Sequence, residues 1–149
     1  MKRIEGEASA TVSASVAACF ELFVAVDRYP VWGPELFREV EVLERAPDGR
    51  PATARAELHI AQSPFSKDFE LVVAVAARPP NVVELTRIPN EPSDREGLEM
   101  TWKATGAAGT RIELGFEAIA SFIPGFVPLP RVGDLIARTL VEAAAAALA

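Results

Sequence analysis

Apolar and polar residues alternate along residues 4–12, IEGEASATV, with a period of two. This period predicts a β-strand that buries one face. From residue 13 to 26 the apolar positions change to helical spacing, and Ser13 or Ser15 can cap the N-terminus of the helix that this spacing predicts. The chain is therefore expected to open with a strand and a short helix.

A second short helical turn is predicted directly after this helix. Asp27 stands where its side chain could cap the turn, and Pro30 and the Gly33–Pro34 pair should end it within a few residues. The same stretch carries Tyr29 and Trp32, two large aromatic residues in what would otherwise be a connector. Large aromatic side chains mainly contribute buried area, so this segment is expected to pack against the rest of the protein.

Six further runs of strand character follow, separated by turn-forming segments rich in proline, glycine and small polar residues. Consecutive strands joined by connections of hairpin length favour an antiparallel meander. The predicted strands are residues 38–44, 52–60, 65–77, 81–88, 97–105 and 110–122.

The chain closes with an amphipathic helix over residues 131–149. Its polar stripe contains Arg131, Asp134, Arg138 and Glu142. Its predicted apolar stripe consists of Val132, Leu135, Ile136, Leu140 and Ala143.

These elements predict an α+β fold in which a curved, seven-stranded antiparallel sheet wraps around the long C-terminal helix, with two short helices after the first strand. The length of 149 residues is typical of one domain, so residues 1–149 are expected to form a single unit. A curved sheet that grips one helix leaves part of its concave face unfilled. This arrangement favours a pocket for an apolar ligand.

Charge and hydropathy narrow the classes of partner. The net charge is −6 at pH 7 and the basic residues are scattered singly, so no nucleic acid is expected to bind. No uninterrupted apolar run is long enough to cross a bilayer, and the first residues lack the apolar region of a signal peptide. The sequence therefore predicts a soluble, cytoplasmic protein without stable membrane insertion.

The sequence holds no strong catalytic motif, and with one His and one Cys neither a metal site nor a cofactor is expected. Cys19 lies among apolar residues and should behave as a small buried hydrophobe. His59 and Glu57 share the polar face of the strand 52–60 and are weak catalytic candidates. His59 could move a proton near neutral pH and Glu57 could orient it, but strand parity makes this the solvent face, and a solvated polar face needs no function.

Strand parity gives the clearest candidates for ligand contact. Arg87 shares a strand face with Val83 and Leu85, and Met100 shares one with Trp102. If it points inward, Arg87 could hold a carboxylate or phenolate through its planar fork of donors. The alternative is that Arg87, near the end of its strand, reaches solvent.

The phenylalanine-rich helix that runs into Asp27, Tyr29, Pro30 and Trp32, together with the element order and the apolar C-terminal helix, resembles the polyketide cyclase/dehydrase and lipid-transport family. That family belongs to the START-related, birch-pollen-allergen-like superfamily, and the resemblance covers essentially the whole chain. It implies the helix-grip fold, in which the two short helices form a V beneath the long helix. Tyr29, Trp32 and Phe37 would then bound the cavity, either as packing residues or in contact with the ligand.

The segment 122–130 before the closing helix is apolar and contains Phe122 and Phe126. It is either a plug over the core or a gate through which an apolar ligand enters. The full set of candidate ligand-binding residues is Arg87, Met100, Trp102, Trp32, Tyr29, Phe122, Phe126, Leu135 and Ile136.

Three functions stay open at this point. The first is the binding of a small hydrophobic molecule, for which the resemblance implies lipids, polyketides, quinones or related aromatic compounds. The second is a polyketide cyclase or dehydratase, which needs an ionisable pair inside the cavity. The third is a protein-interaction module with a vestigial pocket. The family includes both monomers and dimers, which leaves a homodimer open.

Overall fold

The computed structural model describes residues 2–62, 65–106, 108–121 and 129–149. The described residues form one seven-stranded sheet in the order β1-β7-β6-β5-β4-β3-β2, and all neighbouring strands are antiparallel. The strands are β1 Lys2–Val12, β2 Phe37–Arg45, β3 Pro51–Gln62, β4 Phe65–Arg78, β5 Val82–Arg87, β6 Gly97–Thr105 and β7 Thr110–Ala120. The helical elements are α1 Val16–Val24, the 3₁₀ turn η1 Val26–Arg28, α2 Tyr29–Trp32 and α3 Leu129–Ala147.

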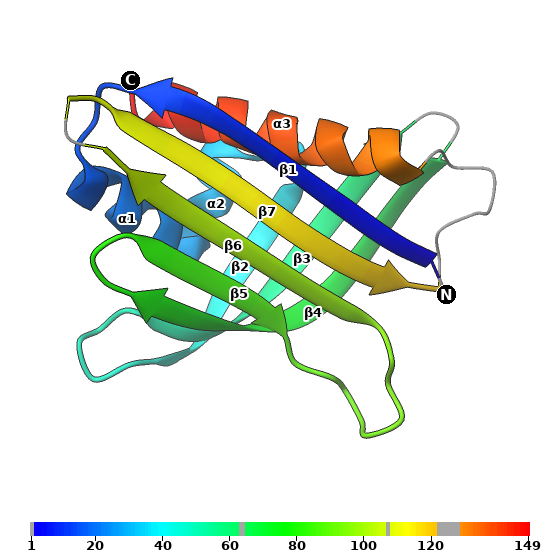
Figure 1. Cartoon of the computed structure of the whole chain (residues 1–149). Helices are drawn as coiled ribbons and strands as arrows, with labels where there is room; N and C mark the ends of the chain where they lie inside the picture. The colour runs from blue at the N-terminus through cyan, green and yellow to red at the C-terminus, as the bar shows by residue number, and fades with distance from the viewer. Residues whose placement is uncertain (1, 63–64, 107, 122–128) are drawn as a thin grey trace.

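Figure 1 shows the sheet curling around α3, with α1 and α2 at one end and the loop between β5 and β6 at the other. The prediction of a helix-grip fold is confirmed, with two short helices after β1 and a long C-terminal helix packed on the sheet. Because β1 pairs with β7, the chain's first strand is joined to its last strand. The edges of the sheet are therefore β1 and β2.

Helix α1 begins as the sequence predicts, and the structure selects one of the two candidate caps. The Ser15 hydroxyl accepts a hydrogen bond of 3.1 Å from the Ala18 N–H. The expected capping role of Asp27 is wrong, since Asp27 lies inside η1 and no side chain caps the following turn. The reason is that η1 begins one residue earlier, at Val26, which places Asp27 within the turn and not before it.

The predicted apolar stripe of α3 is partly wrong. Among the residues of α3 from 132 onward, the buried ones are Val132, Gly133, Ala137, Leu140, Val141 and Ala144. Leu135, which we expected on this face, is 37% exposed, and Ala143 is only half-buried. Successive residues of a helix are rotated by about 100°, so Leu135 points about 200° away from Gly133. Gly133 contacts β1, and this contact sets the rotation of the helix.

The aromatic residues of the connector after α1 form a packed cluster. The Phe23 and Trp102 rings stack at 4.6 Å, and Trp32 meets Trp102 edge-on at 6.1 Å between ring centroids. Tyr29 lies 4.9 Å from Trp32 and 5.0 Å from Phe37. This geometry stabilises α1 and α2 against the sheet beyond the gain from burying their area.

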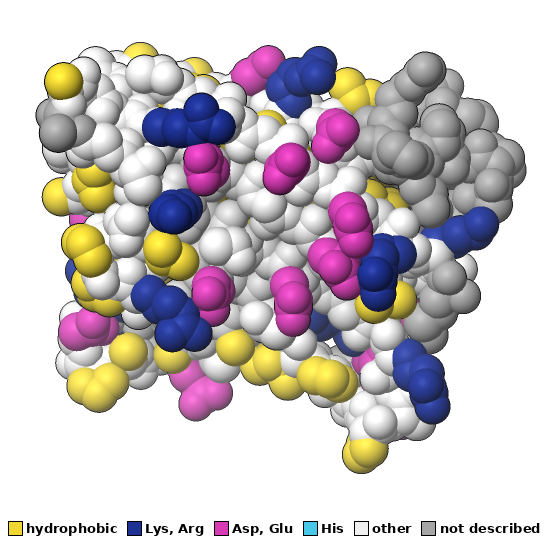
Figure 2. All heavy atoms as spheres, in the orientation of Figure 1, with side chains coloured by type: hydrophobic (Ala, Val, Ile, Leu, Met, Phe, Trp, Pro, Cys, Tyr) yellow, Lys and Arg dark blue, Asp and Glu magenta, His cyan; other side chains and the backbone are white. Residues whose placement is uncertain are grey.

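The outer face of the sheet carries acidic and basic side chains in alternation. Figure 2 shows these charges intermixed over the face formed by β1, β7 and β6. Arg3 pairs with Glu117 of β7 at 3.5 Å, and Arg111 pairs with Glu113 at 2.7 Å. Exposed ion pairs of this kind add little to the stability of the folded protein. The search for a functional site therefore turns to the concave face of the sheet.

Candidate functional site

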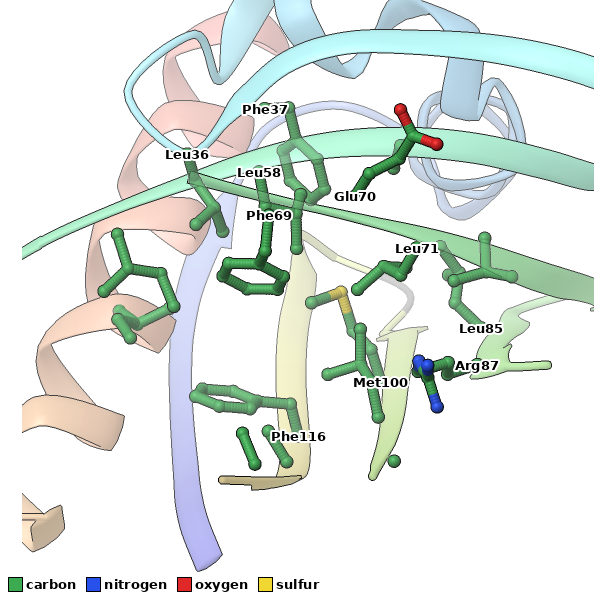
Figure 3. A pocket seen from close by; sticks show the side chains of 18 of the residues that line it. Leu36, Phe37, Leu58, Phe69, Glu70, Leu71, Leu85, Arg87, Met100 and Phe116 are labelled. Atoms are coloured by element: carbon green, nitrogen blue, oxygen red, sulfur yellow. The ribbon is translucent and has the colours of Figure 1, made fainter. Parts of the chain in front are cut away.

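A cavity of about 140 Å³ lies between the concave face of the sheet and α3. All seven strands and α3 contribute to its wall, and most of the lining side chains are apolar. Figure 3 shows part of this lining, with Phe69 and Phe116 projecting from β4 and β7 into the same space. The described lining residues are Ile4, Val26, Tyr29, Leu36, Phe37, Val40, Ala56, Leu58, Ile60, Phe69, Glu70, Leu71, Val73, Leu85, Arg87, Glu96, Gly97, Leu98, Met100, Phe116, Ala118, Ile119, Ala120 and Ile136.

Period-two alternation explains how the strands supply this wall. Alternate residues of β4, namely Phe69, Leu71 and Val73, line the cavity, and Ala56 and Leu58 do so from β3. Leu58, Leu71 and Val73 are buried. Of the intervening residues, Glu57 and Glu70 are exposed, so each strand presents an apolar side to the ligand space.

One end of the cavity is polar, and Arg87 is its centre. The Arg87 side chain is 9% exposed, and its Nη2 donates to Oδ2 of Asp94 at 2.7 Å. Its Nη1 donates to the backbone carbonyl of Glu96 at 2.8 Å. Arg87 therefore lies in the cavity wall, and its guanidinium is hydrogen-bonded to the loop between β5 and β6.

The Asp94 carboxylate organises that loop. In addition to Arg87 it accepts hydrogen bonds from the N–H groups of Asn90 at 3.1 Å and Glu96 at 3.0 Å. The hydrogen bond from Arg87, followed by these two backbone bonds, lowers the pKa of Asp94 to about 2. Asp94 is thus a carboxylate at neutral pH and holds the loop in a turn over Arg87.

Glu96 connects the same loop to the end of β7. Its Oε1 accepts from the Ser121 N–H at 2.9 Å and from the Ser121 hydroxyl at 2.5 Å. These two bonds from Ser121 lower the pKa of Glu96. Arg87 and Glu96 therefore line this end of the cavity, and the Asp94 carboxylate is bonded to Arg87 from the loop.

Tyr29 lines the cavity from α2 but its hydroxyl is already committed. The Tyr29 hydroxyl donates to the carbonyl oxygen of Phe23 at 2.5 Å, which satisfies a group at the C-terminal end of α1. Burial raises the pKa of the Tyr29 phenol far above its usual value. The phenol is therefore a structural donor that joins α2 to α1.

The structure places the candidate ligand-binding residues in three groups. Arg87, Met100, Tyr29 and Ile136 lie in the cavity wall. Trp102 and Trp32 are part of the aromatic cluster and are not among the lining residues, while Leu135 points away from the sheet. Phe122 and Phe126 lie outside the described residues.

The two weak catalytic candidates lie elsewhere. Glu57 is exposed on the outer face of β3 and does not line the cavity. His59 Nδ1 pairs with the carboxylate of Asp68, its cross-strand partner on β4. His59 borders a separate surface depression, which shares only Leu36, Ile60 and Ile136 with the cavity among the described lining residues. The structure thus brings neither candidate to the cavity.

Several lining residues were not among the sequence candidates. Leu58, Leu85 and Phe116 carry a readable signal, because each stands on the apolar side of an alternating strand. Asp94 does not line the cavity but binds Arg87, and it carries no such signal, since it lies in a loop rich in polar residues and reaches Arg87 only when the loop folds back. Within the described ranges, no group of three His, Cys, Asp or Glu residues could hold a metal ion.

No helix in the described part of the chain is long and apolar enough to span a membrane. A model of the family described as "Polyketide cyclase / dehydrase and lipid transport" matches residues 12–148. Comparison with the sequences of curated proteins gave no match.

Solved structures share the fold at low sequence identity. A START superfamily protein from Mycobacterium smegmatis is 17% identical, with a TM-score of 0.76 and 97% of each chain covered. The ginseng major latex-like protein 151 from Panax ginseng is 9% identical, with a TM-score of 0.65 over 98% of this chain and 97% of that one. The di-domain ARO/CYC StfQ from the steffimycin biosynthetic pathway is 14% identical, with a TM-score of 0.66; the match covers 98% of this chain and 50% of that one.

Proposed function

The chain belongs to the polyketide cyclase/dehydrase and lipid transport family, and from this premise we propose that it binds a small hydrophobic molecule in the cavity between the sheet and α3. The observation that carries the proposal is the wall of the cavity, which has apolar side chains from every strand; its charged residues are Arg87 and Glu96 at one end and Glu70, whose side chain is exposed. Affinity comes from removing apolar ligand surface from water, at about 25 cal/mol per Å².

The volume of the cavity limits the size of the ligand. At 140 Å³ it is smaller than typical ligand pockets of roughly 300–1,000 Å³. Apolar cavities of about 150 Å³ accept a single benzene ring. The ligand that fits without rearrangement is therefore a compact aromatic molecule or a short apolar chain, and a lipid or polyketide would require the wall to move.

A second candidate is the cyclisation or dehydration of a polyketide in the same cavity. It is favoured by the position of Arg87 beside an otherwise apolar wall, where a guanidinium could stabilise a developing enolate. Such a reaction also needs a group that moves a proton. The Tyr29 hydroxyl is bonded to Phe23 and Asp94 is held ionised by Arg87, which makes the binding role the better supported of the two.

A third candidate, a protein-interaction module with a vestigial pocket, is favoured by the small volume of the cavity. It differs from the other two in one respect that is simple to measure. An interaction module would not bind a small apolar molecule in the cavity.

The experiment is a calorimetric titration with phenol, a molecule of one aromatic ring, on the wild type and on Ala118→Leu, which fills the cavity from β7. Ala146→Leu, at an exposed position of α3, is the matched control. We expect Ala118→Leu to weaken binding by at least about tenfold, which corresponds to ~1.4 kcal/mol, while Ala146→Leu binds as the wild type does. Equal affinities for all three proteins, or no binding to the wild type, would count against the cavity as the binding site.

Native mass spectrometry of the protein purified from its own host complements the titration. A stoichiometric apolar compound released on denaturation would identify the ligand. Turnover of that compound by the protein would favour the cyclase candidate over a carrier.

A further inference from the structure

The polar end of the cavity has an unusual balance of charge. Arg87 is the only basic side chain among the described residues that line the cavity, and Glu70 and Glu96 are the acidic ones. Glu70 is exposed and pairs outward with Arg55 at 3.5 Å. Figure 3 shows its carboxylate directed away from Met100 and Phe116.

Arg87 is not available as a free cation for an anionic ligand. Its guanidinium is 2.7 Å from the Asp94 carboxylate, and both side chains are largely withdrawn from water, at 9% and 12% exposure. The Glu96 carboxylate is a second negative charge close to the pair, held there by Ser121. One positive charge therefore faces two negative charges at this end of the cavity.

A ligand carboxylate placed beside Arg87 would be a third negative group around a single cation. In a water-poor environment such like-charge contact is unfavourable, and the loss of ligand hydration adds to the penalty. Both protein carboxylates remain ionised at neutral pH, because their hydrogen bonds lower their pKa values. Both therefore carry a negative charge when a ligand enters.

A neutral oxygen meets no such penalty at the same place. A guanidinium carries five N–H donors, and the bonds to Asp94 and to the Glu96 carbonyl use Nη1 and Nη2 once each. A ketone or hydroxyl oxygen can accept from this fork without adding charge. In the ion pair of Arg87 with Asp94, the guanidinium thus keeps free N–H donors, while the Asp94 charge cancels the attraction of Arg87 for anions.

We propose that Asp94 is a specificity-determining residue: by neutralising Arg87, it makes the cavity select uncharged ligands that carry a hydroxyl or carbonyl oxygen over their carboxylate counterparts. This inference rests on the proposed binding function and deepens it by naming the class of ligand. Asp94 acts through Arg87 and is a positioning residue in this sense.

The test compares two one-ring probes of nearly equal size, phenol and benzoate, at pH 7. Phenols titrate near 10 and carboxylic acids near 4, so the first probe is neutral and the second is an anion. The measured quantity is the ratio of the two dissociation constants. It is determined for the wild type, for Asp94→Asn, and for Asp48→Asn, an equal change of charge at an exposed turn residue outside the cavity.

We expect the wild type to bind phenol at least tenfold more tightly than benzoate. Asp94→Asn should shift this ratio at least tenfold toward the anion, because it leaves Arg87 without its charged partner, and Asp48→Asn should leave the ratio unchanged. Glu96→Gln provides a second variant, which should shift the ratio in the same direction if Asp94→Asn does not fold.

The outcomes separate this inference from the proposed function. Tighter or equal binding of benzoate by the wild type overturns the charge selection while leaving the cavity as a binding site. An unchanged ratio in a folded Asp94→Asn protein also overturns it. Failure of both probes to bind the wild type overturns the binding function and the selectivity together.

Discussion

Gly6 of β1 and Gly133 of α3 pack backbone against backbone. A Cβ atom on Gly6 would lie 2.1 Å from the Gly133 carbonyl oxygen, and one on Gly133 would lie 1.8 Å from the carbonyl oxygen of Glu5. Both distances are far shorter than any real contact of a Cβ atom, so only glycine fits at either position. This contact holds one side of α3 tightly on β1. The cavity lies on the concave face of the sheet beside that contact, with Ile136 of α3 and Ile4 of β1 in its wall.

The first prediction concerns Gly133→Ala. In an ordinary helix this change stabilises a protein by about 0.5–1 kcal/mol. Here the added methyl group collides with the Glu5 carbonyl, so we expect a loss of about 1–3 kcal/mol in the free energy of unfolding. Urea denaturation measures the loss. Gly115→Ala is the control, since a Cβ there has no heavy atom within 4 Å. A gain of stability in Gly133→Ala would contradict the close approach of α3 and β1.

The second prediction concerns the Tyr29 hydroxyl. Tyr29→Phe keeps the ring in the aromatic cluster but removes the donor that reaches the Phe23 carbonyl. A buried acceptor left without its donor costs about 1–3 kcal/mol. We expect chemical denaturation to show a loss in this range, whereas Val31→Ala, at an exposed position of the same helix, should change stability by less than about 0.5 kcal/mol. Equal stability of Tyr29→Phe and the wild type would show that the bond contributes nothing.

The third prediction concerns the pH dependence of stability. The pKa of Asp94 is about 2 in the folded protein, below the value near 3.8 of an unperturbed aspartate, because Arg87 donates to the carboxylate. A carboxyl group with a depressed pKa stabilises the folded state above its unfolded pKa, and the contribution disappears as the pH falls through the folded pKa. Stability should therefore decline between about pH 4 and 2. Asp94→Asn should be less stable at pH 6 and should lose part of this decline.

Urea midpoints measured from pH 6 to pH 2.5 test this expectation. The Glu96 carboxyl, whose pKa is lowered by Ser121, contributes in the same direction. For that reason Asp94→Asn should flatten the profile only in part. Superimposable acid profiles of the variant and the wild type would rule out a contribution from the Arg87–Asp94 pair.

The fourth prediction concerns Cys19, the only cysteine of the chain. The residue is fully buried in α1, and burial raises the pKa of its thiol. The thiolate is the reactive form, so a thiol reagent should not label the native protein at neutral pH and should label it completely in denaturant. Stoichiometric labelling of the native protein, at a rate faster than unfolding, would show that α1 opens locally.

The sequence alone determined the order and type of the elements. Alternation with a period of two identified the strands, and helical spacing identified α1 and α3, because these periods follow from backbone geometry. The same parity placed Arg87 beside Val83 and Leu85, and the structure puts all three on the inner side of β5. The resemblance based on Tyr29, Pro30 and Trp32 led to the family to which the chain belongs.

Tertiary structure alone decided which of the inward residues meet the cavity and which are covered. Met100 and Trp102 share one face of β6, yet Met100 lines the cavity and Trp102 is enclosed by the aromatic cluster. The contact between Gly133 and β1 turned Leu135 outward, and the folding of a polar loop brought Asp94 to Arg87. Local periodicity reports the direction of a side chain relative to its own strand or helix. The distance to other elements depends on contacts between residues far apart in the chain, and no local pattern encodes it.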